Sequence, residues 1–404
     1  MKKIVLSALT ALTLGSVALS ANSMKLYQDE KGQLFTSASE GRTLVKDKSV
    51  SIFSKASKLK FSGLTYVGYT YNDRKDDTST MNYKESESNF EIRRAYFQLK
   101  AYLLDDPKSY YRVTFDVHQN KESDMVVRAK YAYLYLNNIL PATGVEFGLA
   151  HRPWHDYEEH NAWLYRDISK VLTETKNGAD LSNSADFGFN FKTKTTYIDN
   201  EIGIFNGEGY HSDFNDDSGD SAGKGMSLEW RTTAHLFGVN GKDKQTKKTY
   251  LDASFFGQYN TKHKTSASGV VGEYDDLVFF GLHTVYNQPE FLISAQYIVS
   301  QDSADNSTYV SAQAGEGFSV NGEYRFGEEK EYRVVARYDS WTPEVLNSDP
   351  SYDKVNNTAV AGFAWEQSHN VQWVGSVEVT NNDEGSNRED LNGVAYMLTS
   401  EVRF

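Results

Sequence analysis

Several residue types are missing or scarce in this chain, and each absence removes a class of protein. The 404 residues include no cysteine, which excludes disulfide bonds, thiol catalysis, cysteine-ligated metals and a lipoprotein anchor. Proline is also scarce, with 6 residues. No apolar run approaches the ~20 residues of a transmembrane helix, and the mean hydropathy is −0.59. A helical membrane protein is therefore excluded.

The chain also lacks a surplus of positive charge. It has 42 Lys and Arg against 55 Asp and Glu, which gives a formal net charge of −13. Proteins that bind nucleic acids carry a basic surface that neutralises phosphates. A nucleic-acid partner is therefore not expected, whereas acidic loops at a cell surface are compatible with this balance.

The N-terminus has the three parts of a secretory signal. Lys2 and Lys3 form a basic region, residues 4–17 form an apolar stretch, and small residues follow up to Ser23. This pattern predicts a signal peptide over residues 1–22 and an exported protein. Residues 23–58 are interpreted as an N-terminal periplasmic segment or a first hairpin. The sequence does not decide whether this segment begins the wall of the next domain.

Aromatic residues are plentiful, and the last strand uses them in a regular pattern. The chain has 27 Tyr, 22 Phe and 29 Gly, a composition that favours β-structure. In residues 393–404, Val394, Tyr396, Leu398, Val402 and the terminal Phe404 share one parity. Such alternation suits a strand with one face on lipid. It is also the form of the C-terminal strand of outer-membrane proteins.

Sixteen segments with this two-residue period follow one another along residues 59–404. They are 59–71, 89–104, 109–118, 125–137, 143–151, 184–194, 197–206, 225–238, 249–261, 276–286, 290–301, 316–327, 331–341, 357–367, 370–380 and 393–404. Short turns alternate with long polar loops between them. Because no open sheet edge can face hydrocarbon, the pattern predicts an all-β fold. We expect one sixteen-stranded antiparallel transmembrane β-barrel with short periplasmic turns and long external loops. The location is then the bacterial outer membrane, with lipid and lipopolysaccharide around the wall.

The third long connection, residues 152–183, differs from the other loops. It contains Trp154 and Trp163 among charged residues, and an apolar spacing at Ile168, Val171 and Leu172. Such residues need something to pack against. We expect this loop to fold into the lumen, with an external lid or a trimer contact as the alternative.

A barrel of sixteen strands is wide enough to hold water, so its charged inner face would control passage. The predicted pore-lining and constriction residues are Arg94, Lys100, Arg112, Arg128, Lys130, Arg152, Arg166, Arg231, Arg325, Arg333 and Arg337. Inner carboxylates are as numerous, so most of these cations are expected to form pairs. Only a cluster of unpaired cations would make an anion filter. If the loop holds the filter, neutralising Arg152 and Arg166 shifts ion selectivity towards cations.

Four motifs resemble the phosphate-selective porin O and P family. They are residues 90–95 (FEIRRA), 334–339 (VVARYD), 203–207 (GIFNG), and 151–154 (HRPW) after 145–148 (VEFG). The resemblance covers roughly residues 59–404 and is closest to divergent members from Campylobacter-like bacteria. It implies a sixteen-stranded trimeric porin whose third loop constricts the pore. A general or weakly selective pore stays open, because carboxylates in the third loop offset its basic residues.

The predicted function is therefore passive diffusion of small hydrophilic solutes and ions, with a possible preference for anions or phosphate. No cofactor, metal or catalytic residue is predicted. A surface adhesin or structural barrel is the main alternative. An outer-membrane hydrolase is a weaker one, since His151, His155 and His160 lie near carboxylates but match no zinc signature.

Overall fold

The computed structural model describes most of the predicted barrel and short pieces before it. The described residues are 27–29, 34–35, 39–40, 42–44, 58–74, 86–102, 106–119, 124–207, 209–210, 225–238, 244–265, 274–302, 314–343, 354–384, 386 and 388–404. The predicted signal peptide, residues 1–22, lies outside this set.

A small antiparallel sheet comes first in the chain. It contains β1 (Tyr27–Asp29), β2 (Leu34–Phe35) and β3 (Arg42–Leu44), in the order β2-β1-β3. Tyr27 pairs with Phe35 and with Leu44. These three strands form a sheet of their own, so they are not strands of the barrel wall.

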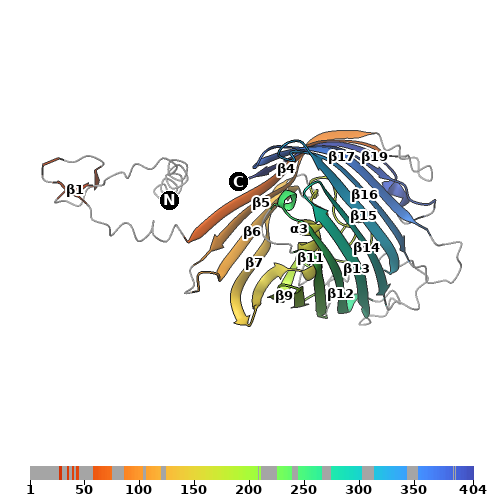
Figure 1. Ribbon diagram of the computed structural model, residues 1–404, viewed down its shortest axis with the longest axis horizontal. Helices are drawn as coiled ribbons and strands as arrows, with labels where there is room; N and C mark the ends of the chain where they lie inside the picture. The colour runs from red at the N-terminus through yellow and green to blue at the C-terminus, as the bar shows by residue number, and fades with distance from the viewer. Residues whose placement is uncertain are drawn as a thin grey trace. The chain divides into compact units, whose positions relative to one another are not determined.

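The other strands close into one antiparallel barrel of sixteen, as the sequence predicts (Figure 1). They are β4 (Leu59–Arg74), β5 (Glu87–Ala101), β6 (Tyr110–Gln119), β7 (Met125–Leu140), β8 (Thr143–His151), β9 (Ala185–Lys194), β10 (Ile198–Phe205), β11 (Ser227–Gly238), β12 (Tyr250–Thr265), β13 (Tyr274–Gln288), β14 (Phe291–Asp302), β15 (Gly315–Phe326), β16 (Tyr332–Pro343), β17 (Asn356–Ser368), β18 (Val371–Thr380) and β19 (Gly393–Arg403). All sixteen correspond to predicted segments. The largest shift is in β12, which was predicted to end at residue 261 and extends to Thr265.

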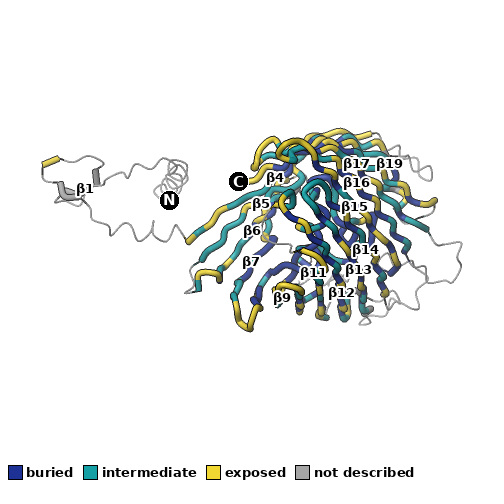
Figure 2. The backbone as a smooth tube through the Cα atoms, viewed as in Figure 1, coloured by how far each residue is buried: buried dark blue, intermediate teal, exposed yellow. Residues whose placement is uncertain are grey.

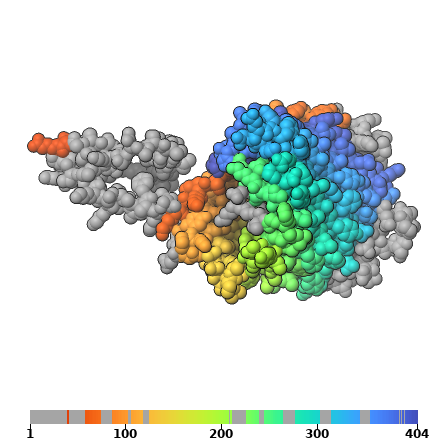
Figure 3. Space-filling model, in the orientation of Figure 1, coloured from red at the N-terminus to blue at the C-terminus, as the bar shows by residue number. Residues whose placement is uncertain are grey.

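The last strand closes the barrel against the first. β19 pairs with β4 from Gly393 opposite Arg74 to Arg403 opposite Leu64. The terminal Phe404 continues this ladder, since its N–H donates to the Gly63 carbonyl (3.1 Å) and its carbonyl accepts from the Gly63 N–H (2.9 Å). In the space-filling view, orange residues of β4 accordingly meet blue residues of the C-terminus (Figure 3). Closure leaves no free sheet edge in the wall.

Exposed and buried residues alternate along the strands of the barrel (Figure 2). In β15, Phe318, Val320 and Tyr324 are exposed, whereas Ser319 and Glu323 are buried. The predicted face assignment is therefore confirmed for this strand. An apolar outside and a polar inside are the arrangement of a barrel that lies in a membrane.

The described part of the chain contains few helices. α3 (Pro153–Asn161) follows β8, and the short 3-10 turns η1 (Gln245–Lys247) and η3 (Glu389–Leu391) lie in two other connections. No helix among the described residues is long and apolar enough to cross a membrane. Figure 1 shows α3 within the ring of strands rather than outside it.

Candidate functional site

The third loop, residues 152–184, enters the barrel directly after β8. Arg152 is extended (φ −83°, ψ 140°), and Pro153 then begins α3, a position where its fixed φ and missing N–H suit a helix start. Asp156 in the first turn favours the helix because it faces the positive end of the helix dipole. The predicted lumenal position of this loop is confirmed by its contacts with inward-facing side chains of several strands, such as Asp252, Glu323 and Thr399.

The front of the loop packs on β12 and β13. The Trp154 indole stacks on Phe256 with ring centroids 3.6 Å apart and an interplanar angle of 3°. The Tyr157 hydroxyl donates to Asp252 (3.1 Å), and the His283 ring meets the Trp154 indole edge to face at 5.1 Å. Trp154 is 4% exposed. The front of the loop is thus held by aromatic packing.

The back of the loop reaches the opposite side of the wall. Tyr165 donates to Glu323 on β15, and Arg337 on β16 donates to the Lys170 carbonyl (2.8 Å). On β19, Thr399 donates to Asp167 (2.5 Å). Trp163 is buried beneath the Arg337 guanidinium, 4.9 Å from it. The loop therefore crosses the lumen from β11–β13 to β15–β19.

A cavity of about 980 Å³ remains between this loop and the inner wall, and its border includes residues of β4–β9 and of β15–β19. Its border includes nine Lys or Arg residues and six carboxylates, a formal excess of three positive charges. This balance is the reverse of the whole chain, whose net charge is −13. The lumen is therefore electrostatically distinct from the protein as a whole.

Five of the eleven predicted cations border this cavity: Arg112, Lys130, Arg166, Arg325 and Arg333. Three of the five form ion pairs with carboxylates. Arg166 bridges Glu159 and Glu174, Arg325 pairs with Glu323, and Arg333 pairs with Glu366. The role of all eleven in ion selectivity stays a prediction.

The other predicted cations lie elsewhere on the inner face. Arg94 and Arg128 share Asp116, at 2.6 and 3.2 Å, and Lys100 lies over the Tyr110 ring at 4.7 Å. Arg152, Arg231 and Arg337 are buried against Glu229 (2.6 Å), Glu201 (2.7 Å) and Asp339 (2.8 Å) respectively. The expectation that most inner charges pair is thus confirmed, and Arg337–Asp339 and Arg325–Glu323 are pairs within one strand.

Arg112 and Lys130 differ from the paired cations. Within the described residues, neither has a carboxylate within the 4.0 Å of an ion pair. The Arg112 guanidinium lies 4.7 Å from the Tyr131 ring centroid and donates to the Tyr133 hydroxyl (3.2 Å). Lys130 donates to the Tyr96 hydroxyl (3.2 Å). Both cations are therefore surrounded by tyrosines instead of carboxylates.

A β-bulge brings these cations and rings onto one face. Opposite Thr114 and Phe115 of β6, the register with β7 shifts, so that Lys130 is the extra residue between Ala129 and Tyr131. Lys130 and Tyr131 are consecutive and both are buried. A bulge reverses the alternation of the strand. Parity from the sequence places Arg128 and Lys130 inside, but it cannot place Tyr131 there as well.

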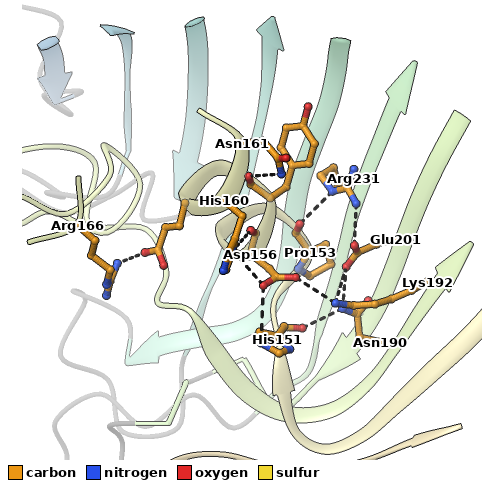
Figure 4. Close-up of polar contacts among 12 residues, drawn as sticks. His151, Pro153, Asp156, His160, Asn161, Arg166, Asn190, Lys192, Glu201 and Arg231 are labelled. Atoms are coloured by element: carbon orange, nitrogen blue, oxygen red, sulfur yellow. Dashed lines mark hydrogen bonds and ion pairs between the residues drawn. The ribbon is translucent and has the colours of Figure 1, made fainter. Parts of the chain in front are cut away.

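Asp156 is the centre of a second charge cluster at the cavity (Figure 4). Its carboxylate lies 3.2 Å from Lys192 Nζ, 3.7 Å from His151 Nε2 and 3.5 Å from His160 Nδ1. Lys192 also meets Glu146 (3.3 Å) and Glu201 (3.4 Å). Neither Asp156 nor Lys192 is among the predicted site residues, although Lys192 shares the parity of the predicted inner residue Asp186.

The tautomer of His151 follows from its neighbours. Arg112 Nη1 lies 3.1 Å from His151 Nε2, and a guanidinium has no acceptor, so Nε2 accepts. His151 Nδ1–H then donates to Glu146 (3.0 Å). The neutral imidazole of His151 thus links Arg112 to the Glu146 carboxylate, with which Arg112 forms no ion pair.

The loop also contains two of the three histidines of the weaker hydrolase hypothesis, His155 and His160. His155 Nε2 lies 2.7 Å from Ser182 Oγ, but His155 Nδ1 is buried without a hydrogen-bond partner. Burial lowers the pKa of His155 to about 3, which makes it a poor general base near neutral pH. Glu159 and Glu174 lie close to it, and both are bridged by Arg166. The arrangement is that of an ion-pair cluster.

A pH response is expected from Glu158, which is buried where α3 meets the wall. Gln296 donates to the Glu158 carboxyl group (2.5 Å), and the neighbours Arg337, Asp339 and Trp154 also affect its pKa. Burial raises the pKa of Glu158 from 4.5 to about 7. The released loop would lose this proton near pH 4.5 and the docked loop only near 7. Docking therefore weakens as pH rises through this window, by about 3 kcal/mol when ionisation is complete.

Single-channel conductance between pH 5 and pH 9 tests this effect. We expect conductance to rise with pH in the wild type and to stay level in Glu158→Gln, which keeps an acceptor for Gln296. His160→Gln serves as the control, because His160 is an exposed titratable group on the same helix. A response that survives Glu158→Gln would assign the titration to another group.

Comparison with known proteins identifies the fold class. A closed barrel with an apolar outside and a polar inside is a transmembrane β-barrel, and such barrels belong to bacterial outer membranes. Solved structures share this fold. The anion-selective porin from Comamonas acidovorans is 12% identical, with a TM-score of 0.60, over 86% of this chain and 99% of its own. OmpF of Salmonella typhi is 11% identical, with a TM-score of 0.58, over 86% and 97%.

A third similar structure is a loop L8 deletion mutant of OmpT from Vibrio cholerae. It is 14% identical, with a TM-score of 0.56, over 86% of this chain and 99% of its own. No family model and no curated protein matches the sequence. At these identities the likeness establishes a porin fold, in agreement with the predicted barrel and outer-membrane location.

Proposed function

We propose that this chain is an outer-membrane porin that lets small hydrophilic solutes and ions diffuse passively and favours anions. The observation that supports this proposal is the pair Arg112 and Lys130, which border the cavity without a carboxylate partner among the described residues. Lys100 adds a third cation beside Arg112 and Lys130, because its position on β5 is directly opposite Arg112 on β6. The proposal includes a homotrimer in lipid and lipopolysaccharide, and a divergent relationship to the phosphate-selective porin O and P family. The motifs in residues 90–95 and 334–339 support that relationship.

The charge arrangement suits such a preference. On the loop side of the cavity, Asp156 is matched by Lys192, and Glu159 by Arg166. The two charges of an ion pair cancel most of each other's electric field at a distance. Arg112 and Lys130 have no such partner, so their positive field remains. An anion that crosses the cavity is therefore attracted to the wall of β5–β7.

Reversal potentials in a planar bilayer under a KCl gradient test the proposal. A unit charge about 8 Å from an ion in water contributes about 0.5 kcal/mol. The charge attracts chloride and repels potassium by this amount. Its removal in Arg112→Gln or Lys130→Gln should therefore lower the chloride-to-potassium permeability ratio about fivefold. Lys108→Gln, at an exposed cation in the turn before β6 that is not part of the cavity border, is the matched control. Absence of conductance steps would reject the porin proposal. Cation preference in the wild type, or equal shifts in all three variants, would reject the anion filter.

A further inference from the structure

Three cations without a carboxylate partner among the described residues, Lys130, Arg112 and Lys100, lie among tyrosine rings on the inner face of β5–β7. We call this set the tyrosine–cation strip, and its members in spatial order are Tyr96, Lys130, Tyr131, Arg112, Tyr133, Tyr110 and Lys100. Lys130 Nζ lies 4.5 Å from the Tyr96 centroid and 5.5 Å from that of Tyr131. Arg112 lies between Tyr131 and Tyr133, at 4.7 and 5.7 Å. Each cation thus has an aromatic ring on at least one side.

The rings change what the cations can hold. The negative face of a ring attracts a cation by about 0.5–2 kcal/mol, so each ring offsets part of the positive charge. A small hydrated anion gains less from such a cation, since it must give up water for a weakened field. An anion with an apolar body gains additional free energy, because its body covers ring surface that water would otherwise contact.

Parts of the strip are open to a solute. Tyr96 and Tyr110 are only partly buried and both border the cavity, whereas Tyr131 and Tyr133 are buried. The two accessible rings flank the two cations along the strip. A cavity of about 980 Å³ is large enough for a single-ring molecule. A solute can therefore place its charge near Arg112 or Lys130 and its ring against Tyr96 or Tyr110.

The β-bulge in β7 makes this arrangement possible, but it costs regular backbone pairing between β6 and β7. The bulge at Lys130 interrupts the β6–β7 ladder, and an interrupted ladder leaves the extra residue unpaired. A regular strand would send Tyr131 and Tyr133 to the lipid side. The bulge is thus the feature that combines charge and aromatic surface on one inner face.

We propose that the tyrosine–cation strip is a binding track for planar aromatic anions, which it selects over small inorganic and aliphatic anions. This inference rests on the proposed porin function. The inference adds a substrate class that charge alone does not define. Inorganic phosphate or chloride would bind to the cations and make no contact that needs the rings.

Block of the KCl current by two sulfonates tests the track. Benzenesulfonate has the ring and methanesulfonate lacks it, and both stay ionised, so neither crosses the bilayer as a neutral acid. In the wild type we expect benzenesulfonate to block at a concentration at least tenfold lower than methanesulfonate. Equal blocking concentrations would overturn the proposal, while the KCl steps themselves would still report a porin.

Variants separate the rings from the charge. Tyr96→Leu and Tyr110→Leu should each reduce the benzenesulfonate-to-methanesulfonate ratio at least threefold, whereas Arg112→Gln should weaken both sulfonates together. Tyr324→Leu is the matched control, because Tyr324 is an exposed tyrosine on the outer face of β15. A ratio unchanged in both inner variants would also overturn the proposal.

Discussion

Replacing Trp154 by alanine is expected to release α3 from the wall and to raise the single-channel conductance several-fold. Trp154 stacks on Phe256 at 3.6 Å with its plane almost parallel, and it contacts Tyr157 and His283 as well. Truncation of a buried tryptophan costs about 3–5 kcal/mol. The other contacts at the front of the loop are polar, such as Arg152 with Glu229 and Arg231 with the Pro153 carbonyl, and they do not replace the aromatic packing of α3 on β12 and β13.

The effect should fall on the loop rather than on the barrel. Sixteen closed strands do not depend on Trp154 for their ladder, since the residue lies outside every strand. Recordings in a planar bilayer should therefore show larger and noisier steps, and protease treatment should cleave the loop faster. Trp365→Ala is the control, because Trp365 is on the outer face of β17 and 40% exposed. Steps of wild-type size in Trp154→Ala would show that α3 does not limit conduction.

The fold could be predicted from the sequence because its determinants are local. Each strand alternates between lipid and lumen, and a two-residue period is visible without any knowledge of partners. In β15, for example, Phe318 and Val320 oppose Ser319 and Asn321 along the printed chain. The order of the strands then follows from neighbour pairing, which leaves little topological choice. The lumenal loop was also predictable, since Trp154 and Trp163 need a surface to pack on.

The candidate site was less predictable because it depends on pairing and on strand phase. Arg152 and Arg112 have the same charge in the sequence, yet Arg152 meets Glu229 and Arg112 meets tyrosines. A second change of phase occurs in β5, where Arg93 donates to the loop carbonyl of Ile168 (3.1 Å) and its neighbour Arg94 pairs with Asp116. Two consecutive residues on one face violate the alternation that identifies faces in the sequence.

The overall charge was also a poor guide to selectivity. A chain with a net charge of −13 encloses a cavity with an excess of cations. An ion in a narrow lumen responds to the groups around it, because charges more than about 8 Å away in solvent are screened at physiological salt. We therefore propose that the filter lies on β5–β7, whereas the sequence left the third loop and the wall as competing candidates.

Glu229→Met is expected to have the largest effect on stability. Glu229 accepts from Arg152 Nε (2.8 Å) and lies 2.6 Å from its Nη2, and both side chains are buried. Asp186, at 3.8 Å, is the next carboxylate. Removal of one partner of a buried pair costs about 3–5 kcal/mol because the other charge stays buried. Arg152 begins the third loop, so the variant should weaken both the barrel and the position of the loop.

The double variant Arg152→Met/Glu229→Met tests whether the loss of stability in Glu229→Met comes from the uncompensated charge of Arg152. Two apolar residues can replace a buried pair with little loss, so we expect the double variant to be more stable than Glu229→Met alone. The temperature at which the barrel loses resistance to SDS is the measurement, and Glu316→Met, at an exposed carboxylate, is the control. Additive losses in the double variant would contradict a buried pair. Because Arg152 is enclosed by Glu229 and Asp186, the double variant should also keep the wild-type reversal potential, unlike Arg112→Gln.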